Sequence, residues 1–152
     1  MAKYLSKTAA GQVPVMSLNS ALVAGLLYEF VTPATPLVAG DIIVMGPIEP
    51  GIKPVSVSLL TDDLDTNAAP TITLTVGILN AAGTDIDAAA TSAWIVASTA
   101  GQTAGVTRST SGNVYLAGAS QVTRQLGIKV VAGPATYAGA NKRMALHFYA
   151  AG

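Results

Sequence analysis

The stretch TDDLDTN gathers the densest group of acidic side chains in the sequence. Carboxylates at alternating positions bind calcium in EF-hand loops, and Asp63, Asp65 and Asn67 match positions 1, 3 and 5 of such a loop. The loop also needs glycine at position 6 and glutamate at position 12, where this sequence has Ala68 and Leu74. The spacing therefore excludes an EF-hand.

Two other kinds of site stay open at this stretch, and a third interpretation is simpler. A looser Ca²⁺ or Mg²⁺ site on Asp62, Asp63 and Asp65 would need further oxygen ligands from elsewhere in the chain. Paired carboxylates serve as acid and base in glycosidases, but those sites need a cleft with aromatic platforms, and aromatic residues make up 5% of this chain. Because Asp and Asn bond their own backbone in turns, we expect a solvated turn between two strands, with Leu64 folded back onto the core.

The other residues capable of catalysis lack the partners that catalysis needs. His147 is the single histidine, so it cannot form a metal site of the two- or three-histidine type. The chain has no cysteine, no GxSxG sequence around a serine, and no GxGxxG or Walker sequence for a nucleotide. We therefore predict that the protein is not an enzyme and has no catalytic, cofactor-binding or metal residue. We expect His147 to be structural or to lie at an interface.

Composition indicates a protein that assembles. Of the 152 residues, 51% are hydrophobic and 11% are charged, against a typical charged share of about 25%. At a formal net charge of zero, a lone monomer of this kind would have little electrostatic protection against association. We therefore expect a homodimer or homotrimer, a monomer with a surface rich in Thr and Ser being the alternative.

Charge distribution and hydropathy exclude two classes of partner. All eight acidic residues lie between Glu29 and Asp87, with Lys53 as the only basic residue among them. No basic run exceeds two residues, so we predict no nucleic-acid partner. The most apolar stretch, ALVAGLLYEFV, is shorter than the about 20 residues of a membrane span, so we predict no membrane partner. The first residues, MAKYLSKTAAGQVPV, lack the apolar run of a signal peptide, so we expect a protein that is made and assembled in the cytoplasm and kept there or released by lysis.

Alternating or apolar runs bounded by turn residues predict six main strands. In residues 71–79, apolar residues alternate with small ones, so one row should face the core and Thr71, Thr73, Thr75 and Gly77 should face outward. A flat threonine row suits an assembly surface as well as it suits solvent. The other five predicted strands are 21–31, 41–48, 53–61, 122–133 and 142–150.

The remaining segments are less regular. We expect a short helix over 88–97 with Asp87 as its N-cap, and a short strand over 114–118. Trp94 should plug one end of the core. The proline-rich stretch GPIEPG, residues 46–51, is typical of a hairpin connection.

Strands outnumber helices, and turns rich in Gly, Pro and Asn separate them. This pattern predicts an all-β fold, a jelly-roll-like β-sandwich with one short helix. Residues 1–20 have no clear period, so we expect an extended N-terminal arm, with a frayed tail as the alternative. Residues 21–152 should form a single β-sandwich domain.

The order GDIIVMGPIEPG, then DDLD, then PTITLTVG resembles small structural proteins of tailed bacteriophages. These are the cement or decoration proteins made beside the major capsid protein. The resemblance covers roughly residues 40–110 and carries no catalytic motif. It implies a jelly-roll-like virion protein that binds the exterior of an icosahedral capsid, contacts the major capsid protein and bridges neighbouring capsomers.

Two surfaces are expected to supply those contacts: the arm, over residues 2–19, and the threonine-rich sheet face. The main alternative is a head- or tail-associated module that binds host-surface glycans, with Tyr137 as a candidate contact. A connector or tail component remains a further alternative. A cupin-type enzyme is disfavoured because cupins take several His and Glu ligands to their metal.

Overall fold

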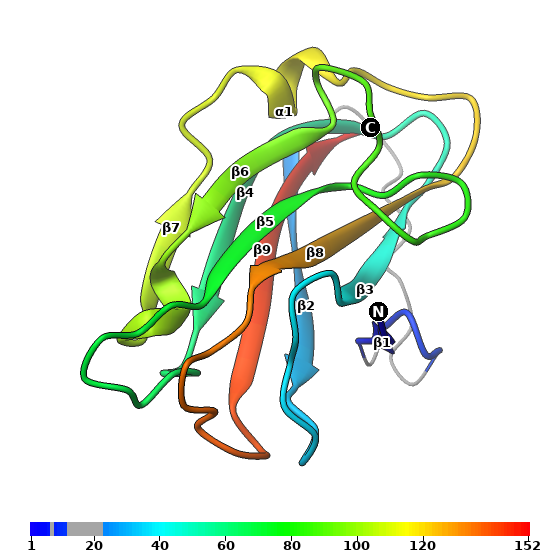
Figure 1. The fold of residues 1–152 in the computed structure, drawn as a ribbon. Coiled ribbons are helices and arrows are strands. Elements are labelled where there is room, and N and C mark those ends of the chain that lie inside the picture. The colour runs from blue at the N-terminus through cyan, green and yellow to red at the C-terminus, as the bar shows by residue number, and fades with distance from the viewer. Residues whose placement is uncertain (7, 12–22) are drawn as a thin grey trace.

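The structure is a computed structural model that describes residues 1–6, 8–11 and 23–152. These residues are mostly β-structure, with one short α-helix (Figure 1). The strands are β1 (Lys3–Leu5), β2 (Val23–Val31), β3 (Ile42–Ile48), β4 (Lys53–Thr61), β5 (Thr73–Ile78), β6 (Ala93–Ser98), β7 (Gly105–Arg108), β8 (Arg124–Ala132) and β9 (Arg143–Ala151). The helical elements are the 3₁₀ turn η1 (Ala100–Gln102) and the helix α1 (Asn113–Leu116).

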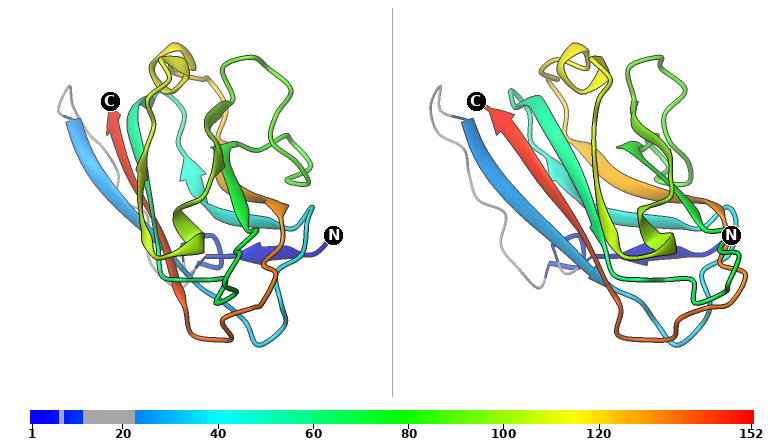
Figure 2. Two further views of the ribbon diagram at one scale, coloured as in Figure 1. Left: turned by 60° about the vertical axis from the view of Figure 1, so that its left-hand side comes forward. Right: turned by 90° about the vertical axis from the view of Figure 1, so that its left-hand side faces the viewer.

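The strands form two sheets that pack face to face, and Figure 2 shows them as two layers. The five-stranded sheet has the order β1-β3-β8-β5-β6, and the four-stranded sheet has the order β2-β9-β4-β7. With β1 set aside, each sheet contributes four strands in the interleaved order of a jelly roll. The expected all-β sandwich with one short helix is therefore confirmed.

The core lies between the two sheets. The predicted inward row of β5 is confirmed, since Leu74, Val76 and Ile78 are all buried. Trp94 of β6 is buried as expected, and its ring stacks on Phe148 of β9 with 6.1 Å between centroids and 7° between planes. This stack joins the two sheets. The Trp94 indole N–H donates to the Thr91 carbonyl at 2.9 Å, which satisfies its polar atom inside the core.

The chain itself covers part of the outer side of the five-stranded sheet. The loop between β5 and β6 folds back over this sheet, beside the turn that follows β1. Lys129 of β8 donates to Asp85 Oδ1 of that loop at 2.7 Å. A second apolar cluster seals this partial third layer and consists of Ala9, Ile42, Val44, Leu79 and Ile86.

The expected threonine face is largely covered for this reason. Thr71 is exposed and Thr73 is half-buried, but Thr75 is buried and its hydroxyl accepts the Ala97 N–H at 3.1 Å. Gly77 lies so close to the backbone that precedes β6 that an added Cβ would come within 2.2 Å of a carbonyl oxygen. The prediction of an open threonine row was wrong, because residues that follow β5 in sequence fold back over it.

Six strands occur where the sequence predicts them, at β2, β3, β4, β5, β8 and β9; residues 21 and 22 lie outside the described residues. The helix expected over 88–97 was wrong, because β6 occupies 93–98 and pairs with β5. Sheet pairing thus overrides the local preference of an alanine-rich segment. The strand expected over 114–118 was also wrong, since α1 lies there.

The proline-rich connection also differs from its prediction. Residues 46–51 lead from β3 to β4, which lie in different sheets, so they form an inter-sheet connection and no hairpin. Glu49 is exposed on this connection. No helix in the described ranges is long and apolar enough to cross a membrane.

The beginning of the chain adds an edge strand to the five-stranded sheet. β1 runs parallel to β3, with Lys3 opposite Ile42. The Ala2 N–H donates to Asp41 Oδ1 at 2.6 Å, and the Ser6 hydroxyl donates to the Met45 carbonyl. Of the arm expected over residues 1–20, residues 7 and 12–20 lie outside the described residues. The arm and its boundary with the domain stay predictions.

Candidate functional site on the four-stranded sheet

Asp65 ties two loops together. Its side chain is 1% exposed, and its carboxylate accepts five backbone N–H bonds from the loop before β5 and the loop between β8 and β9. The donors to Oδ2 are Thr71 (2.7 Å), Ile72 (3.3 Å) and Ala135 (2.8 Å), and the donors to Oδ1 are Asn67 (3.3 Å) and Thr136 (2.8 Å). The residue thus holds together two connections that are far apart in sequence.

These donors also set the charge state of Asp65. Burial by itself raises the pKa of the carboxyl group, but the N–H groups of Thr136, Thr71, Ala135 and Asn67 outweigh burial and hold the pKa below its ordinary value. An ionised carboxylate offers about four lone-pair sites. Five N–H donors therefore occupy the acceptor capacity that a metal ion or a substrate would need.

The other two aspartates of the stretch also have structural partners. Asp63 Oδ1 accepts the Asp65 N–H at 3.1 Å, which closes a turn. Asp62 Oδ2 accepts the Arg143 N–H at 2.7 Å and lies 3.9 Å from its guanidinium Nε. Leu64 is fully buried, as expected. The stretch is a turn with Leu64 turned inward, as expected, but the expectation that it is solvated was wrong for Asp65, which is buried by its backbone donors. In the described part of the chain, no three His, Asp or Glu side chains gather as a metal site.

His147 lies half-buried in the middle of an exposed sheet face. It points away from the core, opposite to its buried neighbours Leu146 and Phe148. Its ring packs against Tyr149, with 4.4 Å between the ring centroids. Both rings lie over Gly25 of β2, where an added Cβ would come within 3.0 Å of His147 Nε2 and 3.2 Å of the Tyr149 ring. Glycine at this position lets the two rings lean across the neighbouring strand.

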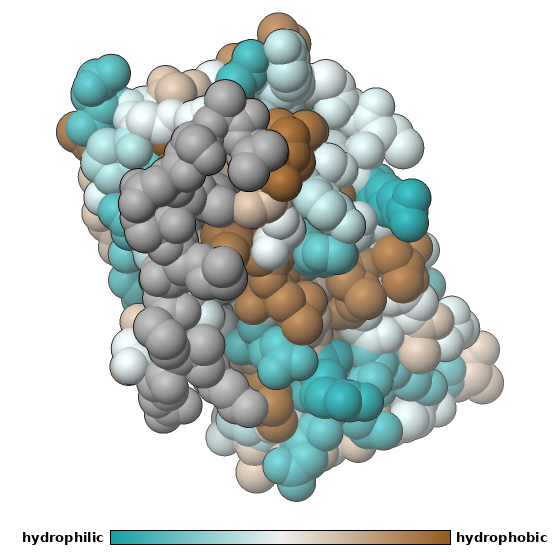
Figure 3. Space-filling view, turned by 180° about the vertical axis from the view of Figure 1, so that it is seen from behind, coloured by the Kyte–Doolittle hydropathy of each residue, from teal (hydrophilic) through white to brown (hydrophobic). Residues whose placement is uncertain are grey.

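We call the outward side of the four-stranded sheet the open face. Several of its apolar side chains are more than half exposed: Val23 58%, Leu27 55% and Val106 59%. Figure 3, which views the molecule from the side of this sheet, shows hydrophobic side chains gathered there. The outward residues of its strands are Val23, Gly25, Leu27, Glu29, Val31, Ser56, Ser58, Leu60, Val106, Arg108, Arg143, Ala145, His147, Tyr149 and Ala151.

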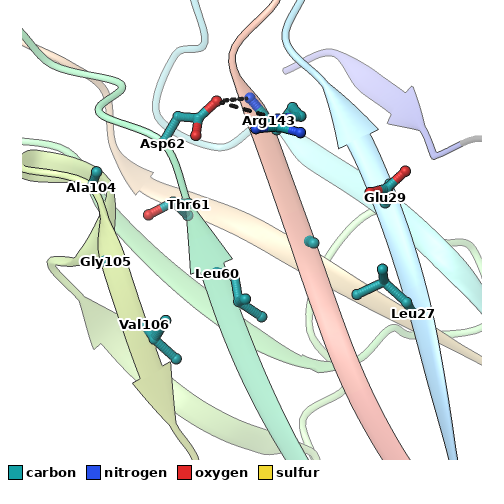
Figure 4. A pocket seen from close by; sticks show the side chains of 10 residues that line it. Leu27, Glu29, Leu60, Thr61, Asp62, Ala104, Gly105, Val106 and Arg143 are labelled. Atoms are coloured by element: carbon teal, nitrogen blue, oxygen red, sulfur yellow. Dashed lines mark hydrogen bonds and ion pairs between the residues drawn. The ribbon is translucent and has the colours of Figure 1, made fainter.

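The open face is hollowed at one end (Figure 4). The hollow has a volume of about 490 Å³ and opens broadly to the surface. Its apolar residues are Leu27, Leu60, Ala104, Gly105, Val106 and Ala145, and its polar residues are Glu29, Thr61, Asp62 and Arg143. An apolar centre with a polar rim is the usual composition of a protein–protein interface.

Tyr137 does not present a free ring to a ligand. It is half-buried against the core, its hydroxyl donates to the Pro33 carbonyl, and its backbone pairs with Asp65. Tyr137 therefore belongs to the loop that Asp65 holds. This leaves the glycan-binding alternative without the contact that the sequence suggested.

Comparison with known proteins identifies the family. A chain in the structure of the capsid of Ralstonia phage GP4 is 36% identical, with a TM-score of 0.81, and the match covers 99% of this chain and 98% of that one. The chain belongs to this family of phage capsid proteins. A chain of the cyanophage Pam1 capsid asymmetric unit is 25% identical, with a TM-score of 0.65 and coverage of 91% and 94%. No family model and no curated protein matches the sequence.

Membership of the capsid protein family gives the chain a structural role in the virion. Both matched structures are capsids, so the residues of interest are those that contact other subunits. The resemblance to phage structural proteins that the sequence suggested is supported at this level.

Sequence reasoning missed the open face of this capsid protein. The segment VAGLLYEFV has apolar residues on both sides of the strand. Tyr28 and Phe30 face the core, while Val23, Leu27 and Val31 face outward. An apolar run of this kind predicts a strand. It does not indicate that one side of the strand is exposed. The sequence did contain one indication: Glu29 is charged and should face solvent. Since side chains alternate along a strand, the other odd-numbered residues of this strand should face outward with it.

Proposed function

We propose that this protein binds the outer surface of an icosahedral phage capsid and cements neighbouring capsomers. The observation that carries the proposal is the likeness over nearly the whole of both chains to a chain of the GP4 capsid. Because coverage is 98% of that chain, the GP4 chain is a polypeptide of nearly the same size. A small sandwich with one partly covered side and one open side rich in apolar residues is suited to lie on a shell that a larger protein builds.

The open face supplies the contact with the major capsid protein. Removing apolar surface from water contributes about 25 cal/mol per Å². A face of this size gives a modest contact for one copy, but repeated copies that bridge several capsomers act together. The hollow beside Arg143 receives a protruding side chain of the shell, and its charged rim fixes the orientation of that contact.

The decisive experiment uses heads of the phage that encodes this chain, prepared without it. Purified protein should bind to the exterior of these heads at the junctions between capsomers, as seen by cryo-EM. The decorated heads should release their DNA at a higher temperature than bare heads. Protein that fails to bind, or that is found only inside the shell or on the tail, would reject the proposal.

A matched pair of variants tests which side faces the shell. Val106→Lys places a charge on the open face, and Val131→Lys places the same charge on an exposed residue of β8 in the other sheet. We expect Val106→Lys to lower the occupancy of heads at least tenfold at limiting protein, and Val131→Lys to leave it unchanged. The opposite pattern would assign the contact to the five-stranded sheet.

A further inference from the structure

The free edge of β2 is the longest unprotected strand edge among the described residues. β2 pairs with β9 over nine residues without a register shift, and within the described ranges no strand pairs with its other edge. The other sheet edges are short or irregular: β1 has three residues, β7 has four, and β6 has register shifts and a positive φ at Ala97. Strand edges are usually protected by Pro, charged side chains or a bulge, and of these VAGLLYEFV has only the single charge of Glu29.

The backbone groups at this edge can be assigned from Thr32, which follows β2. The Thr32 N–H donates to the Lys142 carbonyl at 2.8 Å, and the Thr32 carbonyl accepts the Asn141 N–H at 3.0 Å. Both groups of Thr32 therefore point toward the β9 side. Because these directions alternate along a strand, the N–H and C=O groups of the odd-numbered residues point to the free edge. These residues are Val23, Gly25, Leu27, Glu29 and Val31.

We propose that β2 pairs with β2 of a second copy of this chain, antiparallel about a two-fold axis at Leu27. In this register Leu27 faces its own equivalent, Gly25 faces the partner's Glu29, and Val23 faces the partner's Val31. The two-fold axis repeats the last two pairings, so the strands form five residue pairs. All five are hydrogen-bonded pairs, and with two bonds for each pair the new ladder contains about ten backbone hydrogen bonds.

Side-chain chemistry favours a second copy over an unrelated strand. Each Glu29 carboxylate lies opposite a glycine, so the two acidic groups do not face each other. Because His147 and Tyr149 lean over Gly25, each Glu29 meets an imidazole and a phenol of the other copy. The apolar Val23 and Val31 meet at both ends. The outward side chains of β2 are thus complementary to those of an antiparallel second copy of β2.

This pairing joins two four-stranded sheets into one continuous sheet with both open faces on the same side. The two-fold axis of this antiparallel pair is perpendicular to the sheet. Rotation about such an axis does not turn the sheet over, so the open faces of both copies point in the same direction. The dimer forms whether or not the protein binds capsids. If the proposed capsid role holds, the dimer presents two docking faces at once and gains from bivalence.

The first test is the mass of the full chain in solution, measured by light scattering after size exclusion. We expect twice the 15.2 kDa of one chain. The chain has no cysteine, so single cysteines report on symmetry contacts. Leu27→Cys would place two sulfurs on hydrogen-bonded partners with about 5.5 Å between Cα atoms, within the range that disulfides need. Mild oxidation should convert most of this variant to a covalent dimer on a non-reducing gel.

Val106→Cys is the matched control, because Val106 is as exposed as Leu27 and lies on the same open face. It should remain uncrosslinked under the same conditions. A third variant, Leu27→Lys, places two like charges at the axis and should weaken dimerisation at least 100-fold while the circular dichroism spectrum stays unchanged.

Three results would overturn the inference. The first is a wild-type mass of one or three chains. The second is equal crosslinking by Val106→Cys and Leu27→Cys. The third is crosslinking of Leu27→Cys that occurs only on capsids, which would make a strand of the shell the occupant of the edge. Each is obtained without knowing whether wild-type protein cements heads, so the two proposals can fail separately.

Discussion

Asp65→Asn is the substitution that tests most directly what the acidic stretch does. The change keeps the size and shape of the side chain and removes its charge. In the native protein both carboxylate oxygens accept backbone N–H groups, three at Oδ2 and two at Oδ1. An amide has one carbonyl oxygen, so its NH₂ group must face the donors at one of these positions.

The magnitude follows from the number of donors left without an acceptor. If the NH₂ group takes the Oδ1 position, the N–H groups of Asn67 and Thr136 lose their acceptor. If it takes the Oδ2 position, the three N–H groups that donate there lose theirs. Each buried unsatisfied group costs about 1–3 kcal/mol, and bonds to a charged acceptor are the stronger kind. Allowing for partial relaxation, we expect Asp65→Asn to lower the free energy of unfolding by about 3 kcal/mol.

Guanidinium titration at neutral pH and fixed protein concentration measures this loss. Trp94 is the only tryptophan and is buried in the core, so its fluorescence reports unfolding. Asp63→Asn is the matched control two residues away. Asp63 accepts a single N–H, which an asparagine carbonyl can also accept, so its cost should stay below about 0.5 kcal/mol.

The dependence on pH gives a second readout. The pKa of Asp65 is lowered in the folded protein, while in the unfolded chain it is about 3.9. The stability that its charge provides is therefore complete above about pH 5 and is lost as pH falls below about 4. The difference between wild type and Asp65→Asn should shrink over that acidic range. A cost below about 1 kcal/mol at neutral pH, or a difference that does not change with pH, would refute the proposed role of Asp65.

Three further substitutions, one of them with a control, test the packing and an ion pair. Gly77→Ala should cost about 1–3 kcal/mol because its Cβ would meet a backbone oxygen, whereas Gly105→Ala, with 3.8 Å to the nearest atom, should be near neutral in the same unfolding assay. Trp94→Ala should cost about 3–5 kcal/mol by thermal unfolding, since it removes the stack that joins the sheets; a loss below about 1 kcal/mol would contradict this. Asp85→Asn should cost less than about 1 kcal/mol, because its ion pair with Lys129 is partly exposed; a cost near that of Asp65→Asn would contradict the ranking.

The parts of the fold that sequence predicts well are those in which one row of side chains meets the core. β4 occurs at 53–61 as expected, and its Val57 and Leu59 are buried. Val55 departs from that row, because a register shift between Pro54 and Ser56 interrupts the pairing of β4 with β9. Period-two patterning predicts strands, whereas such local shifts depend on the neighbouring strand.

The parts that sequence predicts poorly are those whose conformation depends on distant residues. The alanine-rich residues 88–97 have few β-branched side chains, and β6 forms there because β5 offers an edge and Phe148 offers a ring to Trp94. Likewise, nothing local in TDDLDTN indicates that Asp65 would accept N–H groups from residues 135 and 136. The turn was predictable from its residue types, but the tie between two loops was not.

The two outer faces of the sandwich explain why a chain with 11% charged residues is also 51% hydrophobic. One core between two sheets does not use all of this apolar surface. On the five-stranded sheet, Leu79 and Ile86 fold back and bury part of the excess within the same chain. On the four-stranded sheet, Val23, Leu27 and Val106 stay exposed in the isolated protomer. On the five-stranded sheet, Leu5, Val96 and Val131 stay exposed too, but each comes from a different strand. The open face instead carries Val23, Leu27 and Val31 on one strand and continues to the free edge of β2, so contacts for assembly are concentrated there.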